Sequence, residues 1–455
     1  MEHMEYDVII IGAGPAGYVA AIRAGQVGLK TALIEKSQIG GMCLNWGCIP
    51  SKAVIESAKL YRRIKNDAQT FGIEGIDKKK LSFNWKQATS RANHIVKKLT
   101  SGVAFLLKKN GIEVINGEAR ITSSNTVTVE NRNLSAKHIL IATGSYHEPL
   151  MAGLPAEKVV ELNQFFKLDE LPKNVVVVGE SSIAVELAQF FNIIDRNVTL
   201  LVPSDRIMPL ADKYLSNWML NKLKKDKVEV LFNVAENAGM SSFDGDELIV
   251  GDQRIKCDVV INSKSRKGVM PAMDINIEQQ DGFIVTNDYF QTNVPNIFAI
   301  GDVNGRSPFA HVGSAQGLHT INFIKGIREK IDKTMYPMNM YSDPEIAQIG
   351  YTEDELIENG TQYKVSEFPL SANGKAMAEG YSEGFIRMLS EEKYGQVLGV
   401  QIVSPNASDM IAEAAAFMQV ESTVSDVAKT IHAHPTISEV FMEAGLGAVD
   451  KSLHI

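Results

Sequence analysis

The sequence has few cysteines, no long apolar run and no basic cluster. Only three of its 455 residues are cysteine, too few for the disulfide framework of a secreted protein. No stretch reaches the roughly 20 apolar residues that a membrane-spanning helix needs. The first apolar run, Val8–Ile11, follows Glu5 and Asp7, so we expect a strand there and not a secretion signal. These features predict a cytoplasmic protein.

Composition narrows the class of partner. The formal net charge is −8, and no run of Lys or Arg is long enough to follow a phosphate backbone, which argues against a nucleic-acid partner. Hydrophobic residues make up 45% and charged residues 22% of the chain, as in ordinary globular proteins. The length is too great for one core and suggests about three domains.

A strand–turn–helix–strand unit occurs twice. The first copy comprises Tyr6–Ile11, Pro15–Val27 and Thr31–Glu35, and the second runs from Asn174 to Val202. Strands that alternate with helices predict parallel sheets with crossover helices, so we expect two Rossmann-like domains. Ile112–Val129 alternates in the manner of antiparallel strands.

The first unit carries a glycine-rich turn between its strand and its helix. Gly12 allows the tight turn, Gly14 lets a pyrophosphate approach the backbone, and Gly17 packs the helix on the strand. Glu35 closes the next strand 21 residues after Gly14, where a carboxylate binds ribose hydroxyls. Because turn, helix and acid all have the expected spacing, we predict a dinucleotide site.

Two further strand ends contribute to the same prediction. Asp302 follows an apolar strand and is suited to bind a ribityl hydroxyl of a flavin dinucleotide. Thr143 and Gly144 belong to a turn of small residues after another strand, where backbone can pass close to a nucleotide. Without the first motif, each of these features would be an ordinary turn.

Cys43 and Cys48 stand five positions apart, just after the second strand and at the predicted start of a helix. A helix N-terminus stabilises a thiolate, and Lys52 adds positive charge one turn beyond Cys48. Such a pair is suited to exchange with a substrate disulfide. Two buried thiols and a zinc site are the alternatives, although zinc needs more ligands than this pair supplies. Cys257 is expected in the core.

A histidine near the C-terminus is the candidate base. His434 precedes Pro435, which keeps the imidazole out of a helix, and Glu439 follows at a distance from which it can hold the second ring nitrogen. Taken alone, this histidine would more often be a core or surface residue. The cysteine pair makes a catalytic role the stronger interpretation.

Together these motifs resemble the flavin-dependent pyridine nucleotide–disulfide oxidoreductase family, and within it the dihydrolipoamide dehydrogenases. The resemblance covers the whole chain. Its most specific marks are the run from Gly40 to Lys52 and the run from His432 to Glu439. Further runs that match are Ile297–Asp302, Ala310–His311 and Ser342–Ala347.

The resemblance implies FAD in the first domain and a homodimer formed by the C-terminal domain. The His434–Glu439 pair would then reach the flavin and the dithiol of the other subunit. Cys43 would exchange with lipoamide, Cys48 would face the flavin, and Lys52 would pair with Glu186. Ala310 belongs to the segment expected at the flavin. Mercuric reductase fits less well because its added C-terminal cysteine pair is absent, and glutathione reductase differs between its cysteines.

The second glycine-rich turn departs from the family pattern. Gly179 is retained, but Ser181 replaces the glycine that allows close approach of the pyrophosphate, and Glu180 adds negative charge. Val202 stands where the strand should end in an acid for the ribose of NAD. Lys264–Arg266 departs from the usual Ile-Gly-Arg turn. We therefore expect a weakened nicotinamide site, with NAD doubtful.

The predicted fold class is α/β, with two Rossmann-like dinucleotide-binding domains plus a C-terminal α+β dimerisation domain. The expected segments are 1–148 (FAD, first part), 149–272 (NAD-type), 273–339 (FAD, second part) and 340–455 (dimer interface). The expected function is FAD-dependent oxidation of free or protein-bound dihydrolipoamide through Cys43 and Cys48. The alternatives are the same chemistry with another electron acceptor, such as a quinone, a ferredoxin or a flavoprotein, or a flavin-binding scaffold without catalysis.

Overall fold

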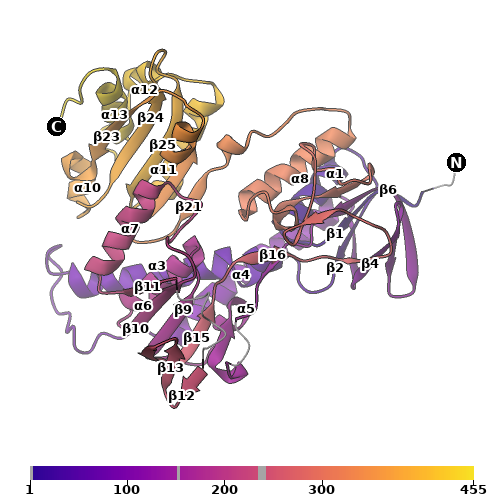
Figure 1. The fold of residues 1–455 in the computed structure, drawn as a ribbon, viewed down its shortest axis with the longest axis horizontal. Coiled ribbons are helices and arrows are strands. Elements are labelled where there is room, and N and C mark those ends of the chain that lie inside the picture. Colours follow the sequence, from indigo (N-terminus) through magenta and orange to yellow (C-terminus); the bar gives the residue numbers. More distant parts are fainter. Residues whose placement is uncertain (1–3, 151–153, 234–241) are drawn as a thin grey trace. The chain divides into compact units, whose positions relative to one another are not determined.

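The computed structural model describes residues 4–150, 154–233 and 242–455, and the chain divides into two compact units (Figure 1). The first unit comprises Met1–Leu150, Val159–Leu171 and Lys264–Ile331. The second unit comprises Met151–Lys158, Pro172–Ser263 and Asp332–Ile455.

An eight-stranded sheet forms the centre of the first unit. Its strands are β1 (Tyr6–Ile11), β2 (Thr31–Glu35), β3 (Glu113–Asn116), β4 (Ala119–Ser123), β5 (Thr126–Val129), β6 (Arg132–Ile141), β17 (Ala272–Met273) and β20 (Ile297–Ala299). The order is β17-β4-β5-β6-β1-β2-β3, and β20 also pairs with β6. Strands β6, β1, β2 and β3 run parallel, whereas β4, β5 and β6 are antiparallel neighbours.

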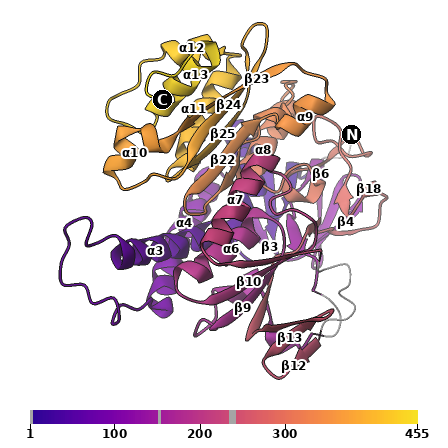
Figure 2. The same cartoon turned by 60° about the vertical axis from the view of Figure 1, so that its left-hand side comes forward.

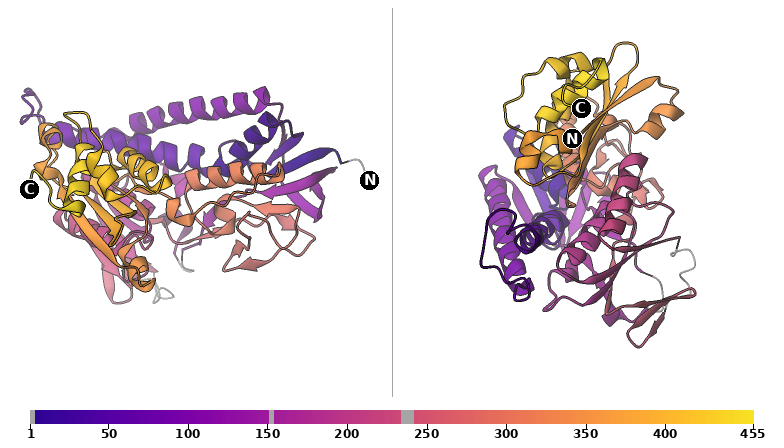
Figure 3. Two further views of the ribbon diagram at one scale, coloured as in Figure 1. Left: turned by 90° about the horizontal axis from the view of Figure 1, so that it is seen from above. Right: turned by 90° about the vertical axis from the view of Figure 1, so that its left-hand side faces the viewer.

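The first unit also contains α-helices. They are α1 (Pro15–Gln26), α2 (Gly41–Asn45), α3 (Cys48–Asn66), α4 (Trp85–Lys109), α5 (Leu162–Phe165) and α8 (Ala310–Ile324). Figure 3 shows α3 and α4 side by side, in agreement with their contacts. Helices α1 and α8 pack closely, since a Cβ at Gly317 would lie 2.7 Å from the Ala16 carbonyl oxygen.

The remaining short elements of the first unit are β7 (Ser145–His147), β8 (Val159–Glu161), β16 (Arg266–Gly268), β18 (Gln279–Gln280), β19 (Phe283–Ile284) and the 3₁₀ helix η3 (Gly301–Asn304). The run of apolar residues in β1 has a simple explanation. Ile9 and Ile11 belong to one core cluster, and Val8 and Ile10 belong to the cluster on the other face. A strand buried on both faces must be apolar throughout.

A parallel sheet in the order β11-β10-β9-β15 begins the second unit. Its elements are β9 (Asn174–Val178), α6 (Ser182–Ile193), β10 (Asn197–Val202), α7 (Lys213–Lys225), β11 (Glu229–Phe232) and β15 (Val259–Asn262). A three-stranded antiparallel sheet of β12 (Ser242–Asp244), β13 (Glu247–Val250) and β14 (Gln253–Lys256) precedes β15. With β9 in the middle, this order matches one half of a Rossmann fold.

The C-terminal part of the second unit is an antiparallel sheet in the order β21-β22-β25-β24-β23, covered by helices (Figure 2). Its strands are β21 (Met338–Met340), β22 (Glu345–Gly350), β23 (Tyr363–Pro369), β24 (Phe385–Glu391) and β25 (Val397–Ser404). Its helices are α9 (Glu353–Glu358), α10 (Gly374–Ala378), α11 (Ala407–Gln419), α12 (Val424–Lys429) and α13 (Glu439–Val449). The 3₁₀ turns of this unit are η1 (Ala156–Lys158), η4 (Lys333–Met335) and η5 (Leu370–Ala372).

The structure confirms the predicted α/β class and the four strands of the two repeated units. One prediction was partly wrong. Within Ile112–Val129, β4 and β5 are antiparallel as expected, but β3 pairs parallel with β2. The long helix α4 leads into β3, and such a crossover connection returns the chain in the parallel direction. Among the described residues, no helix is long and apolar enough to cross a membrane.

We predict that Phe441→Ala destabilises the second unit. Phe441 is fully buried on α13 in the C-terminal core, so its loss should cost roughly 3–5 kcal/mol. Val449→Ala on the same helix is the control, because Val449 is 54% exposed. Urea unfolding followed by circular dichroism should show a lower midpoint for the first variant only. Equal midpoints for both variants would contradict the predicted packing.

Candidate active site

Two adjacent helices bring the thiols together. Cys43 lies in the short helix α2, and Cys48 is the first residue of the 19-residue helix α3. Gly47 joins them with φ −120° and ψ −113°, and a Cβ there would lie 2.9 Å from the Met42 carbonyl oxygen. The Asn45 amide donates to the Ile39 and Gly41 carbonyl oxygens at 3.0 and 2.8 Å, which fixes α2. The sequence predicted both cysteines at the start of one helix, whereas in the structure one helix ends and another begins between them.

The electrostatics of the pair are those of a coupled dithiol. Both cysteines are unoxidised and partly buried, and their side chains are hydrogen-bonded to each other. That hydrogen bond raises the pKa of Cys43, and burial and the charge of a Cys48 thiolate act in the same direction. Lys52 acts in the opposite direction. The pair therefore favours one thiolate over two, with Cys48 at the positive end of α3.

Tyr18 is a neighbour of the thiols that sequence reasoning missed. It lies on α1, and burial raises the pKa of its phenol, with smaller contributions from Cys43 and Cys48. The phenol therefore stays protonated and can donate a hydrogen bond. Nothing in the local sequence connects Tyr18 with Cys43, because the contact depends on how α1 and α2 fold together.

The first glycine-rich turn has open space where a phosphate would need it. Gly12 has φ +103°, and a Cβ there would lie 2.4 Å from the Ala142 carbonyl oxygen. A Cβ at Gly17 would lie 1.8 Å from the Gly12 oxygen, whereas a Cβ at Gly14 meets no atom within 4 Å. The Glu35 carboxylate accepts hydrogen bonds from the backbone N–H groups of Ala13 and Ser37 at 2.7 and 2.8 Å. This geometry suits a dinucleotide.

Asp302 lies in η3, just beyond β20, and its carboxylate has two side-chain partners. Its carboxylate pairs with the Arg266 guanidinium at 2.7 Å and accepts from the Ser145 hydroxyl at 2.7 Å. Arg266 also donates to the Met42 sulfur at 3.4 Å, next to Cys43. The sequence treated Arg266 only as part of an altered turn, and its link to Asp302 could not be anticipated.

Thr143, Gly144 and Ala310 lie near the loops of the same sheet. The Thr143 hydroxyl donates to the Val269 carbonyl oxygen, so it is partly engaged within the protein. Gly144 has φ +77° and open space beside it. Ala310 is the first residue of α8. All three belong to the first unit, together with the thiols.

The candidate base and its carboxylate are in contact in the second unit. His434 Nδ1 lies 2.9 Å from Glu439 Oε1, and the Thr436 N–H donates to the other carboxylate oxygen at 2.8 Å. Although burial raises the pKa of Glu439, these two hydrogen bonds lower it below its usual range. The ionised carboxylate orients the ring, so that Nε2 is left toward solvent on an imidazole whose side chain is 80% exposed.

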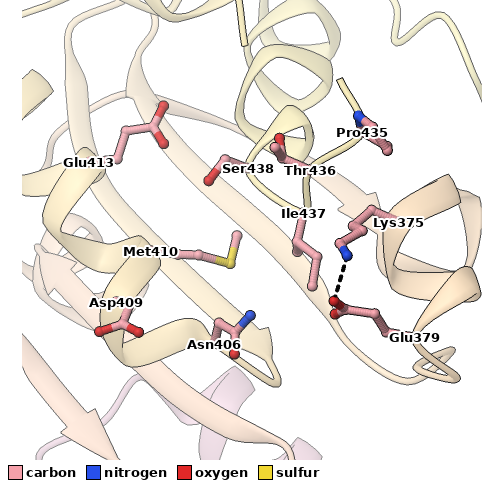
Figure 4. A pocket seen from close by; sticks show the side chains of 10 residues that line it. All are labelled: Lys375, Glu379, Asn406, Asp409, Met410, Glu413, Pro435, Thr436, Ile437 and Ser438. Carbon is pink, nitrogen blue, oxygen red and sulfur yellow. Dashed lines mark ion pairs between the residues drawn. The ribbon is translucent and has the colours of Figure 1, made fainter. Parts of the chain in front are cut away.

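A pocket of about 450 Å³ lies beside this loop in the second unit (Figure 4). Its lining comes from α10, α11 and the segment before α13, and it includes an ion pair between Lys375 and Glu379 at 2.7 Å. The lining residues are Lys375, Glu379, Asn406, Asp409, Met410, Glu413, Pro435, Thr436, Ile437 and Ser438. The residues that directly follow His434 therefore form part of the wall of this pocket.

Glu186 lies on α6 in the second unit, whereas Lys52 lies on α3 in the first. Glu186 is 5% exposed, and its carboxylate accepts from the Tyr341 N–H at 2.9 Å. Its predicted pairing with Lys52 stays a prediction. Cys257 is fully buried, and burial raises the pKa of its thiol to about 12, which leaves it unreactive.

Gly179 begins the second glycine-rich turn, whose residues differ from those of the first turn. Ser181 stands where the first turn has Gly14, and Val202, at the end of β10, is fully buried where the first unit has Glu35. Among the described residues, no three His, Cys, Asp or Glu side chains form a group that could hold a metal ion.

A coupled dithiol beside an open dinucleotide turn, in a chain with two Rossmann-like parts, defines a disulfide oxidoreductase of the two-dinucleotide-domain class. Comparison with known proteins agrees. Residues 6–317 match the pyridine nucleotide-disulphide oxidoreductase model, and residues 336–445 match the dimerisation domain of that family. The chain belongs to the pyridine nucleotide-disulphide oxidoreductase family.

Within this family the chain is similar to dihydrolipoyl dehydrogenases. It is 35% identical to one from Bacillus subtilis, with 99% of each chain covered. It is 36% identical to mitochondrial dihydrolipoyl dehydrogenase 1 of Arabidopsis thaliana, with 99% of this chain and 92% of the relative covered. The crystal structure of LpdA from Mycobacterium tuberculosis has the same fold, with a TM-score of 0.88, 23% identity, and coverage of 96% and 99%.

We predict that Gly14→Ala lowers the amount of bound flavin without disturbing the fold. The added methyl group meets no protein atom but occupies the space that a pyrophosphate needs. Gly102→Ala on α4 is the control, because its Cβ also meets nothing. The ratio of flavin to protein absorbance and the circular dichroism of the purified variants measure the two effects. Full flavin content in Gly14→Ala would contradict the assigned role of this turn.

Proposed function

We propose that this protein is an FAD-dependent homodimeric enzyme that oxidises dihydrolipoamide, free or bound to a lipoyl protein, through a Cys43–Cys48 redox disulfide. The observation that carries the proposal is the hydrogen-bonded thiol pair, in which Cys43 lies in α2 and Cys48 begins α3, with Lys52 one turn further on. The similarity to dihydrolipoyl dehydrogenases over nearly the whole chain supports this substrate class. A cytoplasmic location follows from the need to keep such a pair reducible.

The first half of the reaction is a thiol–disulfide exchange. In the oxidised enzyme, a substrate thiolate attacks Cys43 Sγ, the Cys43–Cys48 bond breaks, and Cys48 leaves as a thiolate that the N-terminus of α3 stabilises. The second substrate thiol then displaces Cys43, which gives lipoamide and the enzyme dithiol. Bound FAD supplies the capacity to accept the two electrons of that dithiol, and the Cys43–Cys48 disulfide forms again.

His434 would accept the proton of the substrate thiol. Glu439 holds Nδ1, so Nε2 faces outward and can accept the proton. We propose that His434 of the partner subunit serves the thiols of this subunit, because the C-terminal part matches a dimerisation domain. A contribution of this kind from a general base is typically worth about 10²–10⁴ in rate.

The proposed cofactor residues follow from the geometry of the first unit. Gly12, Gly14, Gly17 and Glu35 would hold the pyrophosphate and the ribose of FAD. The rest of the flavin dinucleotide would be lined by Thr143, Gly144, Asp302 and Ala310. The resemblance to the family adds Lys52 and Glu186, which would contribute charge near the reactive end of the flavin.

The decisive test uses dihydrolipoamide as the electron donor and a redox dye as the acceptor. Cys48→Ser should lower turnover by at least about 10³-fold, because no disulfide can form and exchange stops. Cys257→Ser is the matched control, since Cys257 is buried and has no role in the exchange. Equal turnover in Cys48→Ser and the control would refute the proposal. Flavin-containing wild-type protein without turnover would indicate a non-catalytic scaffold.

Mixed dimers test whether the subunits share the site. Cys48→Ser and His434→Gln should each be nearly inactive, the second by about 10²–10⁴-fold. After equal amounts of the two variants are unfolded and refolded together, a shared site predicts recovery of about one quarter of wild-type turnover, because about half of the dimers are mixed and half of the sites in each mixed dimer are intact. Refolding each variant alone is the control. If the mixture stays inactive while its dimers form, both groups act within one subunit.

A further inference from the structure

The second glycine-rich turn differs from the first in the space that it leaves for a phosphate. At Gly14 the place of a Cβ is empty, whereas Ser181 fills the corresponding place in the second turn with a side chain. Gly179 is still required, since a Cβ there would lie 2.1 Å from the Ser263 carbonyl oxygen. The turn has therefore kept its shape, but the Ser181 side chain occupies the space through which a phosphate would approach the backbone.

Glu180 connects this turn to the loop that follows β10. Its carboxylate accepts a hydrogen bond from the Ser204 hydroxyl, and its backbone oxygen accepts one from the Met208 N–H. In a Rossmann fold the adenosine ribose lies between the turn after the first strand and the end of the second strand. The Glu180–Ser204 hydrogen bond thus crosses the place where that ribose would lie.

The end of β10 offers no acceptor for the ribose. In the first unit the Glu35 carboxylate stands at the end of β2, but Val202 at the end of β10 is fully buried and aliphatic. Arg206 is the nearest basic residue in the chain that follows, and its guanidinium donates to the Pro209 carbonyl oxygen at 2.6 Å. The strand therefore does not end in the acid typical of an NAD site, and the acid of the loop, the exposed Asp205, stands three positions further on. The arginine of the loop is engaged within the loop.

The charge of Glu180 also opposes a bound dinucleotide. The N-terminus of α6 favours an anion, but the Glu180 carboxylate already stands one residue before the N-cap Ser181. A pyrophosphate would have to approach a like charge at short range. Two buried hydroxyl oxygens beside the turn, those of Ser181 and Ser263, have no hydrogen-bond partner among the described residues. They are suited to ordered water, but they are neutral and do not replace the missing acid.

From these features we infer that the second dinucleotide fold excludes nicotinamide dinucleotides, and that Glu180, held by Ser204, is the residue most responsible for the exclusion. The functional consequence of this inference rests on the proposed dithiol–flavin function, because the exclusion decides whether NAD can receive the electrons. The exclusion itself is a property of the turn between β9 and α6 and of the loop that follows β10, and it is measurable without turnover.

The first measurement is equilibrium binding of NADH to the oxidised wild-type holoenzyme, followed by NADH fluorescence, with anaerobic flavin absorbance recorded in parallel. We expect no saturation below about 1 mM, the regime in which binding is worth only about 4 kcal/mol. Saturation at micromolar NADH with reduction of the flavin would overturn the inference. NADPH, measured in the same way, should give the same result as NADH.

Substitutions that restore the family features should create the site. The triple variant Glu180→Gly/Ser181→Gly/Val202→Glu should tighten NADH binding by roughly 10- to 1000-fold, since each restored contact is worth about a tenfold change. Glu180→Gln keeps the size of the side chain and removes its charge, whereas Ser204→Ala removes the hydrogen bond to Glu180 and keeps the charge. Tighter binding in Glu180→Gln would show that the negative charge of Glu180 repels the dinucleotide. Tighter binding in Ser204→Ala would show that the hydrogen bond between Glu180 and Ser204 blocks the site.

Failure of both single variants to bind NADH more tightly would overturn the assignment to Glu180, whether or not the triple variant gains affinity. Reduction of the flavin by dihydrolipoamide, measured on every variant, shows that each is folded and keeps its dithiol intact. This control also separates the two proposals. If dihydrolipoamide does not reduce the wild-type flavin, the proposed function fails, while the NADH dissociation constants still decide whether the second site is closed.

Discussion

The connection between α2 and α3 at Gly47 is the constraint on which the chemistry depends. A disulfide requires the two sulfurs to meet, and five positions along one continuous helix would separate Cys43 from Cys48 by more than a full turn. The chain instead stops one helix and begins another, which needs a residue without a Cβ, because a side chain at Gly47 would press on the Met42 carbonyl oxygen 2.9 Å away. This break places one thiol at the positive end of α3 and the other against it.

Much of the fold could be predicted from local patterns. The runs Val8–Ile11 and Val175–Val178 are apolar because both faces of these strands are buried, and a glycine follows each run. The spacing of Gly12, Gly14 and Gly17 predicted a tight turn packed against the neighbouring strand, and the space around these glycines is consistent with that turn. The pairing of β3 was wrong because alternation along a strand carries no information about the direction of its neighbour.

The contacts of the site were less accessible to sequence reasoning. Arg266 meets Asp302, and Tyr18 lies near the thiols, through loops and helices that only the folded chain brings together. The second turn gave the opposite case. Its altered residues were visible in the sequence, but the hydrogen bond from Ser204 to Glu180 was not. The two turns therefore share a fold but differ in the side chains that would face a dinucleotide.

The central claim is that electrons enter the flavin through the Cys43–Cys48 pair. Its most direct test is the anaerobic addition of dihydrolipoamide to the purified holoenzyme, followed by the full absorbance spectrum. The account predicts a long-wavelength band, which arises when the Cys48 thiolate lies against oxidised flavin, together with two newly titratable thiols for each subunit. An unchanged spectrum and an unchanged thiol count in flavin-loaded protein would contradict the account.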